Sequence, residues 1–272
     1  MMNTVILVPQ GAEYKAVCRG LRQNTGSIPR VLAIPVGMQP LTKYLQQWDK
    51  QQSPVSSSPT QNCHVELAGE QGAGRKGENL SPPLPAPCPE ASHHTKFSWQ
   101  TTRVLVMGLC GSLRQNYAVG DAVLYQSCTY QGRVQECDRP LMTQLSAALP
   151  KVSLVKGLTS DRVIWSATKK SSLAATSNCD VVDMESFAAL QFFQAMGIEV
   201  AVLRVVSDDS LHDIPDLSAA ISTDGSLQAL PLAWGLISQP IAATRLIRGS
   251  LQGLKVLEKV TQALLDSNLI NT

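Results

Sequence analysis

Residues 199–206, EVAVLRVV, form an almost continuously apolar run that is followed directly by Ser207, Asp208 and Asp209. A strand that is apolar at nearly every position has to be covered on both faces. Short apolar runs typical of strands recur at 4–8, 30–37, 102–108 and 122–130, and helical patterns alternate with them at 12–23, 40–48, 140–149 and 184–196. This alternation predicts a three-layer α/β/α fold with a central mixed, largely parallel sheet.

The chain has 272 residues, 44% of them hydrophobic, which is enough for one large core. We therefore expect residues 1–272 to form a single domain. The stretch 49–99 holds 7 of the 16 prolines together with much Ser, Gln and Gly, and is predicted to be a disordered insert within that domain. The C-terminal part is expected to be helical, with breaks near Pro231 and Pro240.

The composition excludes several classes of protein. With a net charge of +2 and 5% aromatic residues, neither electrostatic capture of nucleic acid nor a base-stacking surface is expected. Seven cysteines without a CxxC pair, and four histidines without metal-ligand spacing, predict no disulfide framework and no metal site. We see no membrane span and no signal peptide, so the expected location is the cytoplasm.

Carboxylates stand beside the ends of three apolar elements. Asp208 ends a buried strand, where burial would favour its protonated form and make it a candidate general acid; capping of a turn is the alternative. Glu185 and Glu13 stand at helix starts, where the alternative is that each simply complements the helix dipole. Because ligands of α/β sheets bind beyond the carboxyl ends of the strands, the segments that carry Glu13 and Asp208 are expected to lie at the ligand site.

The stretch 108–112, GLCGS, is expected to be a glycine-rich loop whose backbone N–H groups approach a ligand. It matches neither the dinucleotide-binding pattern nor the P-loop. Cys110 is a possible nucleophile, but a small buried role is favoured because no histidine is near in sequence. Arg204 inside a buried strand needs partners, which carboxylates at neighbouring strand ends would supply.

Five motifs occur in order: GAE (11–13), GLCGSL with VGD (108–121), LTSDRVIWSATKKSSL (158–173), VDMES (182–186) and RVVSD (204–208). Together they resemble the purine nucleoside phosphorylase and methylthioadenosine nucleosidase superfamily, whose members cleave the N-glycosidic bond of nucleosides. The resemblance covers most of the chain outside 49–99. It implies a small-molecule purine nucleoside as substrate, no metal or organic cofactor, and a homo-oligomer.

The resemblance also implies roles for single residues. Asp208 would protonate, or hydrogen-bond to, N7 of the departing purine, and Glu13 matches the carboxylate that positions the attacking water in nucleosidases. Glu185 would bind ribose hydroxyls and Met184 would pack against the sugar. The further residues expected to contact the substrate are Val163, Ile164, Gly108, Cys110, Gly111 and Arg204.

Three departures favour water over phosphate as the nucleophile. Hexameric bacterial phosphorylases hold phosphate with arginines in the first loop and just before the glycine loop. Here the first loop reads VPQGAEY (8–14), Val106 stands at the second position, and Leu109 stands where a phosphate-binding serine often occurs. Arg19 or Arg22 could still reach a phosphate, so a phosphate-dependent phosphorylase remains the alternative.

The C-terminal third and the stretch IPVGMQP (34–40) resemble the hopanoid-associated phosphorylase-like subgroup, which removes adenine from adenosylhopane. The apolar helices of this tail would either flank a lipid-like 5′ substituent or build an oligomer interface. We therefore expect an enzyme that releases the free base from a 5′-modified adenine nucleoside. Two alternatives are a non-catalytic nucleoside-binding protein of the same fold and a scaffold that recruits partners through the proline-rich stretch of 49–99.

Overall fold

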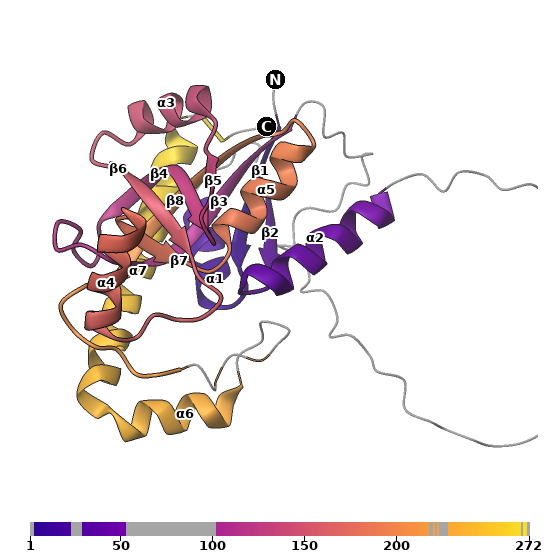
Figure 1. Cartoon of the computed structure of the whole chain (residues 1–272). Coiled ribbons are helices and arrows are strands. Elements are labelled where there is room, and N and C mark those ends of the chain that lie inside the picture. The colour runs from indigo at the N-terminus through magenta and orange to yellow at the C-terminus, as the bar shows by residue number, and fades with distance from the viewer. Residues whose placement is uncertain are drawn as a thin grey trace, which may run out of the picture.

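The computed structural model describes residues 3–22, 29–52, 102–217, 220, 222, 228–267 and 269–270. Helices lie around a central sheet (Figure 1). The strands are β1 (Asn3–Pro9), β2 (Arg30–Ile34), β3 (Thr102–Ser112), β4 (Ala122–Tyr130), β5 (Arg133–Glu136), β6 (Ser153–Thr159), β7 (Val181–Asp183) and β8 (Glu199–Asp208). The helices are α1 (Ala12–Leu21), α2 (Met38–Gln52), α3 (Arg139–Ala148), α4 (Ala167–Ser177), α5 (Ser186–Ala195), α6 (Ala229–Ser238) and α7 (Pro240–Asp266).

The prediction of a mixed, largely parallel sheet is confirmed. Its strand order is β2-β1-β3-β7-β6-β4-β5, and β8 pairs with both β3 and β4. Five of the eight strand pairings are parallel: β1 with β2, β1 with β3, β3 with β8, β4 with β6, and β6 with β7. β3 pairs with β7, β7 with β6, β6 with β4, β4 with β8, and β8 with β3. These pairings close a ring of strands, which brings the ends of β3, β7 and β8 together.

Helices cover the sheet on both sides, as expected for strands that are apolar on both faces. α1 packs against α7, which also packs on β8, whereas α2 packs against α5 (Figure 1). The interior of β8 from Val200 to Val206 is completely buried, and so are Val5 to Val8 of β1. This packing fixes the carboxyl ends of β1, β3 and β8, where the candidate site lies.

Several local predictions were wrong. The expected loop at 109–112 continues strand β3, because Gly111 and Ser112 pair with Val182 and Val181 of β7. The helix expected from 184 begins at Ser186, since the Asp183 carboxylate accepts the backbone N–H groups of Glu185 and Ser186 and holds the chain in a turn there. The short strands β5 and β7 and helix α4 were not predicted.

The C-terminal segment is helical, as predicted, with one correction. A break does occur at Pro240, which begins α7. Pro231, in contrast, lies in the first turn of α6, where a backbone N–H would have no partner within the helix, so the proline does not interrupt the helix. The predicted disorder of 49–99 lies outside the described residues except for 49–52, which are the end of α2. Among the described helices, none combines the length and the apolar character needed to cross a bilayer.

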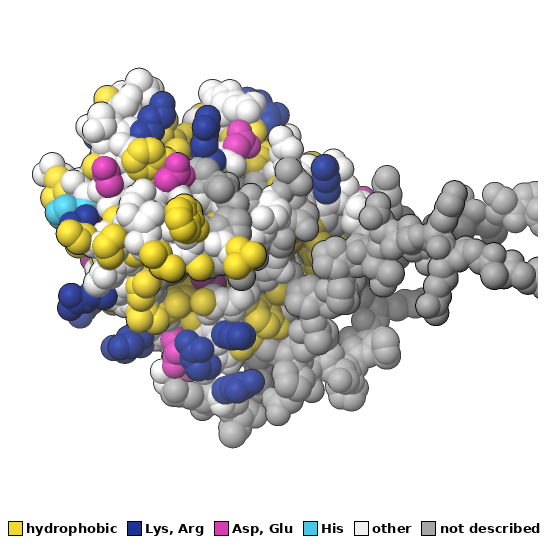
Figure 2. Space-filling model, turned by 90° about the horizontal axis from the view of Figure 1, so that it is seen from below, with side chains coloured by type: hydrophobic (Ala, Val, Ile, Leu, Met, Phe, Trp, Pro, Cys, Tyr) yellow, Lys and Arg dark blue, Asp and Glu magenta, His cyan; other side chains and the backbone are white. Residues whose placement is uncertain are grey.

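Helix α6 leaves a large apolar surface uncovered. Leu230, Trp234 and Ile237 are 84%, 75% and 74% exposed, and Ile241 at the start of α7 is 76% exposed. The spacing of Leu230, Trp234 and Ile237 places these three side chains on one side of α6, and Ile241 follows in the first turn of α7. Figure 2 shows a band of hydrophobic side chains on this underside of the molecule, with lysine and arginine side chains near it.

Candidate active site

A cavity of about 170 Å³ lies at the carboxyl ends of β1, β3, β7 and β8. Eight of the predicted site residues line it: Glu13, Cys110, Gly111, Val163, Ile164, Met184, Glu185 and Asp208. Gly108 and Arg204 lie behind this lining and belong to neither of the two cavities described here. The other residues that line it are Pro9, Val36, Leu109, Arg162, Val182, Asp183, Ser207 and Ile214.

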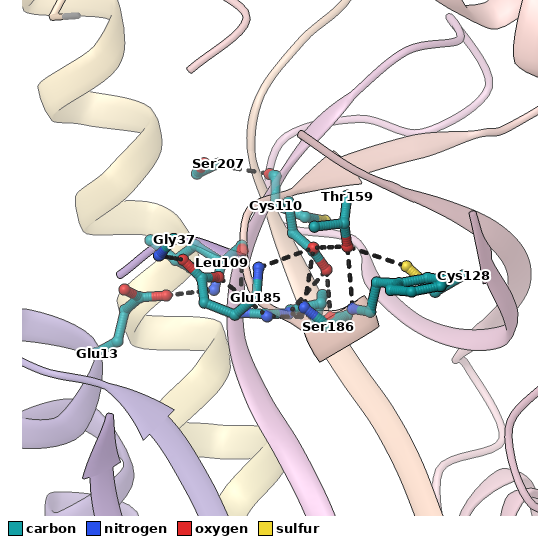
Figure 3. Close-up of polar contacts among 12 residues, drawn as sticks. Glu13, Gly37, Leu109, Cys110, Cys128, Thr159, Glu185, Ser186 and Ser207 are labelled. Carbon is teal, nitrogen blue, oxygen red and sulfur yellow. Dashed lines mark hydrogen bonds and ion pairs between the residues drawn. The ribbon is translucent and has the colours of Figure 1, made fainter. Parts of the chain in front are cut away.

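Glu13 stands in the first turn of α1, directly after the turn that follows β1. Its Oε1 accepts a hydrogen bond of 2.5 Å from the backbone N–H of Leu109 on β3 (Figure 3). Although the residue as a whole is partly exposed, its carboxyl group is enclosed by protein. Burial raises the pKa of Glu13 to about 7, against the opposing effect of Arg204 and of the Leu109 hydrogen bond. The group therefore changes charge near neutral pH.

Glu185 is held by two donors from different parts of the fold. The backbone N–H of Gly37 donates to Oε1 at 3.0 Å (Figure 3). Nη2 of Arg204 donates to Oε2 at 3.2 Å. Burial raises the pKa of Glu185, Arg204 opposes this shift, and Asp183 reinforces it. Since a carboxylate can accept about four hydrogen bonds, Glu185 retains acceptor positions for a ligand in the cavity.

Arg204 supports the site from behind and is completely buried. Its Nε lies 3.4 Å from Asp183 Oδ2, in addition to the bond with Glu185. Burial by itself would lower the pKa of Arg204, but Asp183 and Glu185 hold that pKa above its ordinary value. The carboxylate partners expected for this arginine are therefore present, while its predicted contact with substrate has no counterpart in the cavity lining.

Asp183 is a buried carboxylate that the sequence did not single out. It accepts hydrogen bonds from Thr159 Oγ1 at 2.9 Å and from the hydroxyl of Ser186. Thr159 in turn accepts the backbone N–H of Phe187 at 3.1 Å. These bonds tie the ends of β6 and β7 to the start of α5 and so fix where Glu185 lies (Figure 3).

Asp208 ends β8 and has an environment that differs from the apolar one expected. Its Oδ2 forms an ion pair with Nζ of Lys170, a residue of α4 that is completely buried. Its Oδ1 accepts a hydrogen bond of 3.0 Å from the hydroxyl of Ser207. The candidate acid therefore faces a buried ammonium group and a hydroxyl group.

The glycines of the stretch 108–112 make room for side chains of the site. A Cβ on Gly108 would lie 2.4 Å from Nη1 of Arg204 and 2.7 Å from Oε1 of Glu13. A Cβ on Gly111 would lie 2.8 Å from Oδ2 of Asp208. The expectation of a loop that offers backbone N–H groups to a ligand is thus replaced by a strand that lets charged side chains approach closely.

Cys110 is 4% exposed, and burial raises the pKa of its thiol well above the ordinary value. A thiol that keeps its proton is a poor nucleophile. This agrees with the small buried role that the sequence favoured. In the described part of the chain, no three His, Cys, Asp or Glu side chains are grouped so that they could hold a metal ion.

A second cavity, of about 260 Å³, adjoins the first. The two share four lining residues: Val36, Arg162, Val163 and Met184. Neither Arg19 nor Arg22 lines either cavity, and Arg19 forms an ion pair of 2.8 Å with Glu258 on α7 instead. The arginine that does line both cavities is Arg162, which the sequence did not indicate as a site residue.

Lys170 and Arg162 both lie inside the motif LTSDRVIWSATKKSSL, yet neither was predicted to act. One signal was available for Lys170. In a helix over this segment, Lys170 and Ala174 share one face, and these are the residues that α4 buries. A lysine on a buried helix face requires an acidic or carbonyl partner.

Comparison with known proteins agrees with this fold. Residues 92–224 match the family model described as the phosphorylase superfamily. The fold is similar to futalosine hydrolase of Helicobacter pylori, with a TM-score of 0.60 and 12% identity over 97% of both chains. It is equally similar to 5′-methylthioadenosine/S-adenosyl homocysteine nucleosidase of H. pylori, with a TM-score of 0.60 and 11% identity over 97% of this chain and 98% of that one.

A third structure, a putative 5′-methylthioadenosine/S-adenosylhomocysteine nucleosidase from Francisella philomiragia, has a TM-score of 0.59 and 11% identity over 98% of this chain and 99% of that one. No curated protein sequence matches the chain. At these identities the solved structures establish the fold, whereas the family match rests on the sequence itself. The matched segment contains Lys170, Glu185 and Asp208, so the part of the chain that carries these residues is similar to the phosphorylase superfamily.

Proposed function

We propose that the protein is an enzyme that hydrolyses the N-glycosidic bond of a purine nucleoside, with a 5′-modified adenine nucleoside as the substrate class. The observation that carries this proposal is that Glu13, Glu185 and Asp208 line one cavity at the carboxyl ends of the strands. Two of the similar solved structures are named as nucleosidases acting on 5′-methylthioadenosine and S-adenosylhomocysteine, which supports the substrate class.

Asp208 acts on the base in this proposal. The C1′–N9 bond breaks with its electron pair going to the base, and Asp208 supplies a proton to N7 so that a neutral purine leaves. Proton transfer from a positioned group typically contributes about 10²–10⁴-fold to the rate. Val163 and Ile164 pack against the faces of the purine, because both line the same cavity as Asp208.

Glu13 acts on the nucleophile. A water molecule adds to C1′ and gives one proton to the Glu13 carboxylate. A general base works best when its pKa lies near the working pH, and burial places the pKa of Glu13 at about 7. The hydrogen bond from Leu109 fixes the carboxyl group, so one oxygen remains for the water.

Glu185 acts on the sugar. With Gly37 and Arg204 holding its two oxygens, the carboxylate keeps lone pairs for ribose hydroxyls. Its negative charge also opposes the positive charge that develops on the ribose ring as the bond breaks. Met184 packs against the sugar and lies between the two cavities, so the 5′ substituent extends into the second cavity.

Water is favoured over phosphate by the charges around the cavity. Four carboxylate residues line it, namely Glu13, Asp183, Glu185 and Asp208, against one arginine, Arg162. A phosphate dianion entering this set would meet more negative than positive groups, whereas a water molecule carries no such cost. Phosphorolysis remains the second candidate because Arg162 is exposed and borders the cavity.

The decisive experiment is a panel of nucleosides assayed for free base with and without phosphate. The panel contains adenosine, 5′-methylthioadenosine, S-adenosylhomocysteine, adenosylhopane and inosine. We expect adenine release from a 5′-modified nucleoside without phosphate. Release that requires phosphate would replace hydrolysis by phosphorolysis, and binding measured by calorimetry without any base release would make the protein a non-catalytic nucleoside binder.

A homo-oligomer is also proposed, with the exposed face of α6 as its contact surface. Leu230, Trp234, Ile237 and Ile241 are largely exposed, and neighbouring exposed apolar side chains are typical of a protein–protein contact surface. Replacing Trp234 and Ile237 together by serine should reduce the mass seen in analytical ultracentrifugation to that of a monomer. The matched control is Val134→Ser. Val134 is 58% exposed but lies on β5, away from α6, so its replacement should leave the mass unchanged.

A further inference from the structure

Lys170 is a buried charged residue that has no role in the proposed reaction. Its side chain is completely inaccessible to solvent, although lysine is rarely buried in a folded protein. It points from α4 toward the end of β8, where its Nζ meets Oδ2 of Asp208 and lies 2.6 Å from the backbone oxygen of Asp209. An ammonium group has three protons to donate, and two of them are taken up by these acceptors.

The position of Lys170 is set by both ends of the contact. Helix α4 begins with the Ser166 side chain as its cap, and Asp213 accepts the backbone N–H of Ala167 at 2.7 Å. These bonds tie the start of α4 to the segment that follows β8. Asp208 is fixed in turn by the Ser207 hydroxyl. The lysine and the carboxylate are therefore held together by two independent elements.

The other charged groups around the Lys170–Asp208 pair form ion pairs with other residues or are exposed. Asp209 is paired with His212 at 3.0 Å, and Arg204 is paired with Asp183 and Glu185. Lys169 on the same helix is exposed. The groups that face the pair from neighbouring elements are Cys110 on β3, Asp183 and Glu185 before α5, Arg204 on β8, Arg162 before α4, and Asp209, His212 and Asp213 after β8.

We propose that Lys170 positions Asp208 and supplies, through it, the proton that the leaving base takes up. This inference rests on the proposed function. Before the reaction the pair is an ammonium and a carboxylate. As the C1′–N9 bond breaks, one proton moves from Nζ to Oδ2, and the carboxyl group so formed gives one proton to N7. The pair is then a neutral amine and a carboxylate, and the amine regains its proton from solvent.

The ion pair explains how a carboxylate can serve as the acid near neutral pH. A carboxyl group alone loses its proton at a much lower pH than an ammonium group does. In a pair that shares a proton, the titration belongs to the pair and not to either group. The proton that reaches N7 is therefore held by Lys170 and Asp208 together.

The test compares Lys170→Met, Lys170→Arg and the exposed neighbour Lys169→Met on the nucleoside that the wild type cleaves. We expect Lys170→Met to lower kcat about 100-fold or more with less than about a threefold change in KM. Its alkaline limb should move to lower pH by at least about one unit, because Asp208 then has to hold the proton alone. Lys169→Met should match the wild type in all three respects.

Lys170→Arg separates proton supply from placement. Arginine keeps the positive charge but does not give up its proton in proteins, so kcat should stay low even where thermal stability returns. Lys170→Gln, which keeps a donor for Asp208, serves as the second variant if Lys170→Met does not fold, and it should show the same shift of the alkaline limb.

Unchanged kcat and an unchanged pH profile in Lys170→Met would overturn the role of Lys170 alone, and full recovery of kcat in Lys170→Arg would overturn proton supply. If the wild type releases no base from any nucleoside of the panel, the proposed function itself fails, and the role of Lys170 fails with it. The two failures are thus distinguished by the wild-type assay.

Discussion

Gly111 and Asp208 are register partners on the neighbouring parallel strands β3 and β8, and the glycine leaves the space that the Asp208 carboxylate occupies. A Cβ on Gly111 would lie 2.8 Å from Oδ2 and 3.3 Å from Oδ1. The register between the two strands shifts at Cys110 and Gly111, where β3 turns to pair with β7. The direction of the candidate acid is therefore set by the absence of a side chain on the opposite strand.

Gly111→Ala should displace Asp208 while the rest of the fold is kept. The added methyl group forces the carboxylate away from its position, and an error of about 1 Å in a reacting group can cost roughly 100-fold in rate. We expect kcat to fall by about 10- to 100-fold with a thermal unfolding midpoint close to that of the wild type. Wild-type kcat in this variant would mean that the position of Asp208 does not limit the reaction.

The dependence of activity on pH should report Glu13. With its pKa raised to about 7 by burial, the Glu13 carboxylate accepts a proton above that pH, so kcat/KM should rise with pH through about 7. Glu13→Gln should lower kcat about 10²–10⁴-fold and remove this acidic limb. The measurement is base release between pH 5 and pH 9. An acidic limb that persists unchanged in Glu13→Gln would assign it to another group.

The same group should lower the stability of the fold as the pH rises. The pKa of Glu13 is about 7 in the folded state against an ordinary value of 4.5, so the folded chain holds this proton more tightly. Stability is therefore lost as the pH rises from about 4.5 through 7. Glu13→Gln, which is neutral throughout, should gain about 1–2 kcal/mol over the wild type at pH 8 and nothing at pH 4.5, allowing for partial exposure.

Urea unfolding of both proteins at the two pH values checks this sign. A gain of equal size at pH 4.5 and pH 8 would show that the effect comes from packing and not from the charge of Glu13. A loss at pH 8 would contradict the raised pKa directly.

Removing Arg204 should cost far more than removing a surface arginine. Arg204→Met leaves the buried carboxylates of Asp183 and Glu185 without their cation, which typically costs about 3–5 kcal/mol. Arg19→Met breaks the exposed pair with Glu258 and should change the free energy of unfolding by less than about 1 kcal/mol. Equal losses in the two variants would mean that the buried network does not stabilise the fold.

Much of the fold could be predicted from the pattern of apolar residues. The runs at β1, β3, β4 and β8 are apolar enough to require burial on both faces, and this alone indicates a sheet between helices. The three-residue strand β7 was missed because Val181–Asp183 is too short to show a period. Its pairing with Gly111 and Ser112 extended β3 through what reads locally as a loop.

The site divides in the same way. Glu13, Glu185 and Asp208 could be found because each carboxylate follows an apolar element, where the ends of strands meet a ligand. Lys170 and Asp183 could not be found in this way, because Lys170 lies inside a helix and the two valines before Asp183 are too short a run to indicate a strand. Only the position of α4 against the end of β8 shows that Lys170 has a carboxylate as its partner.

The sequence by itself determined which segments are buried and which carboxylates stand at their ends, because burial of apolar side chains follows from local pattern. The tertiary structure decided which charges meet. Arg204 reaches Asp183 and Glu185, and Lys170 reaches Asp208, across separations of 19 or more residues. Such pairings depend on how strands and helices are packed in space, and a local pattern of residues does not indicate which distant residues come into contact.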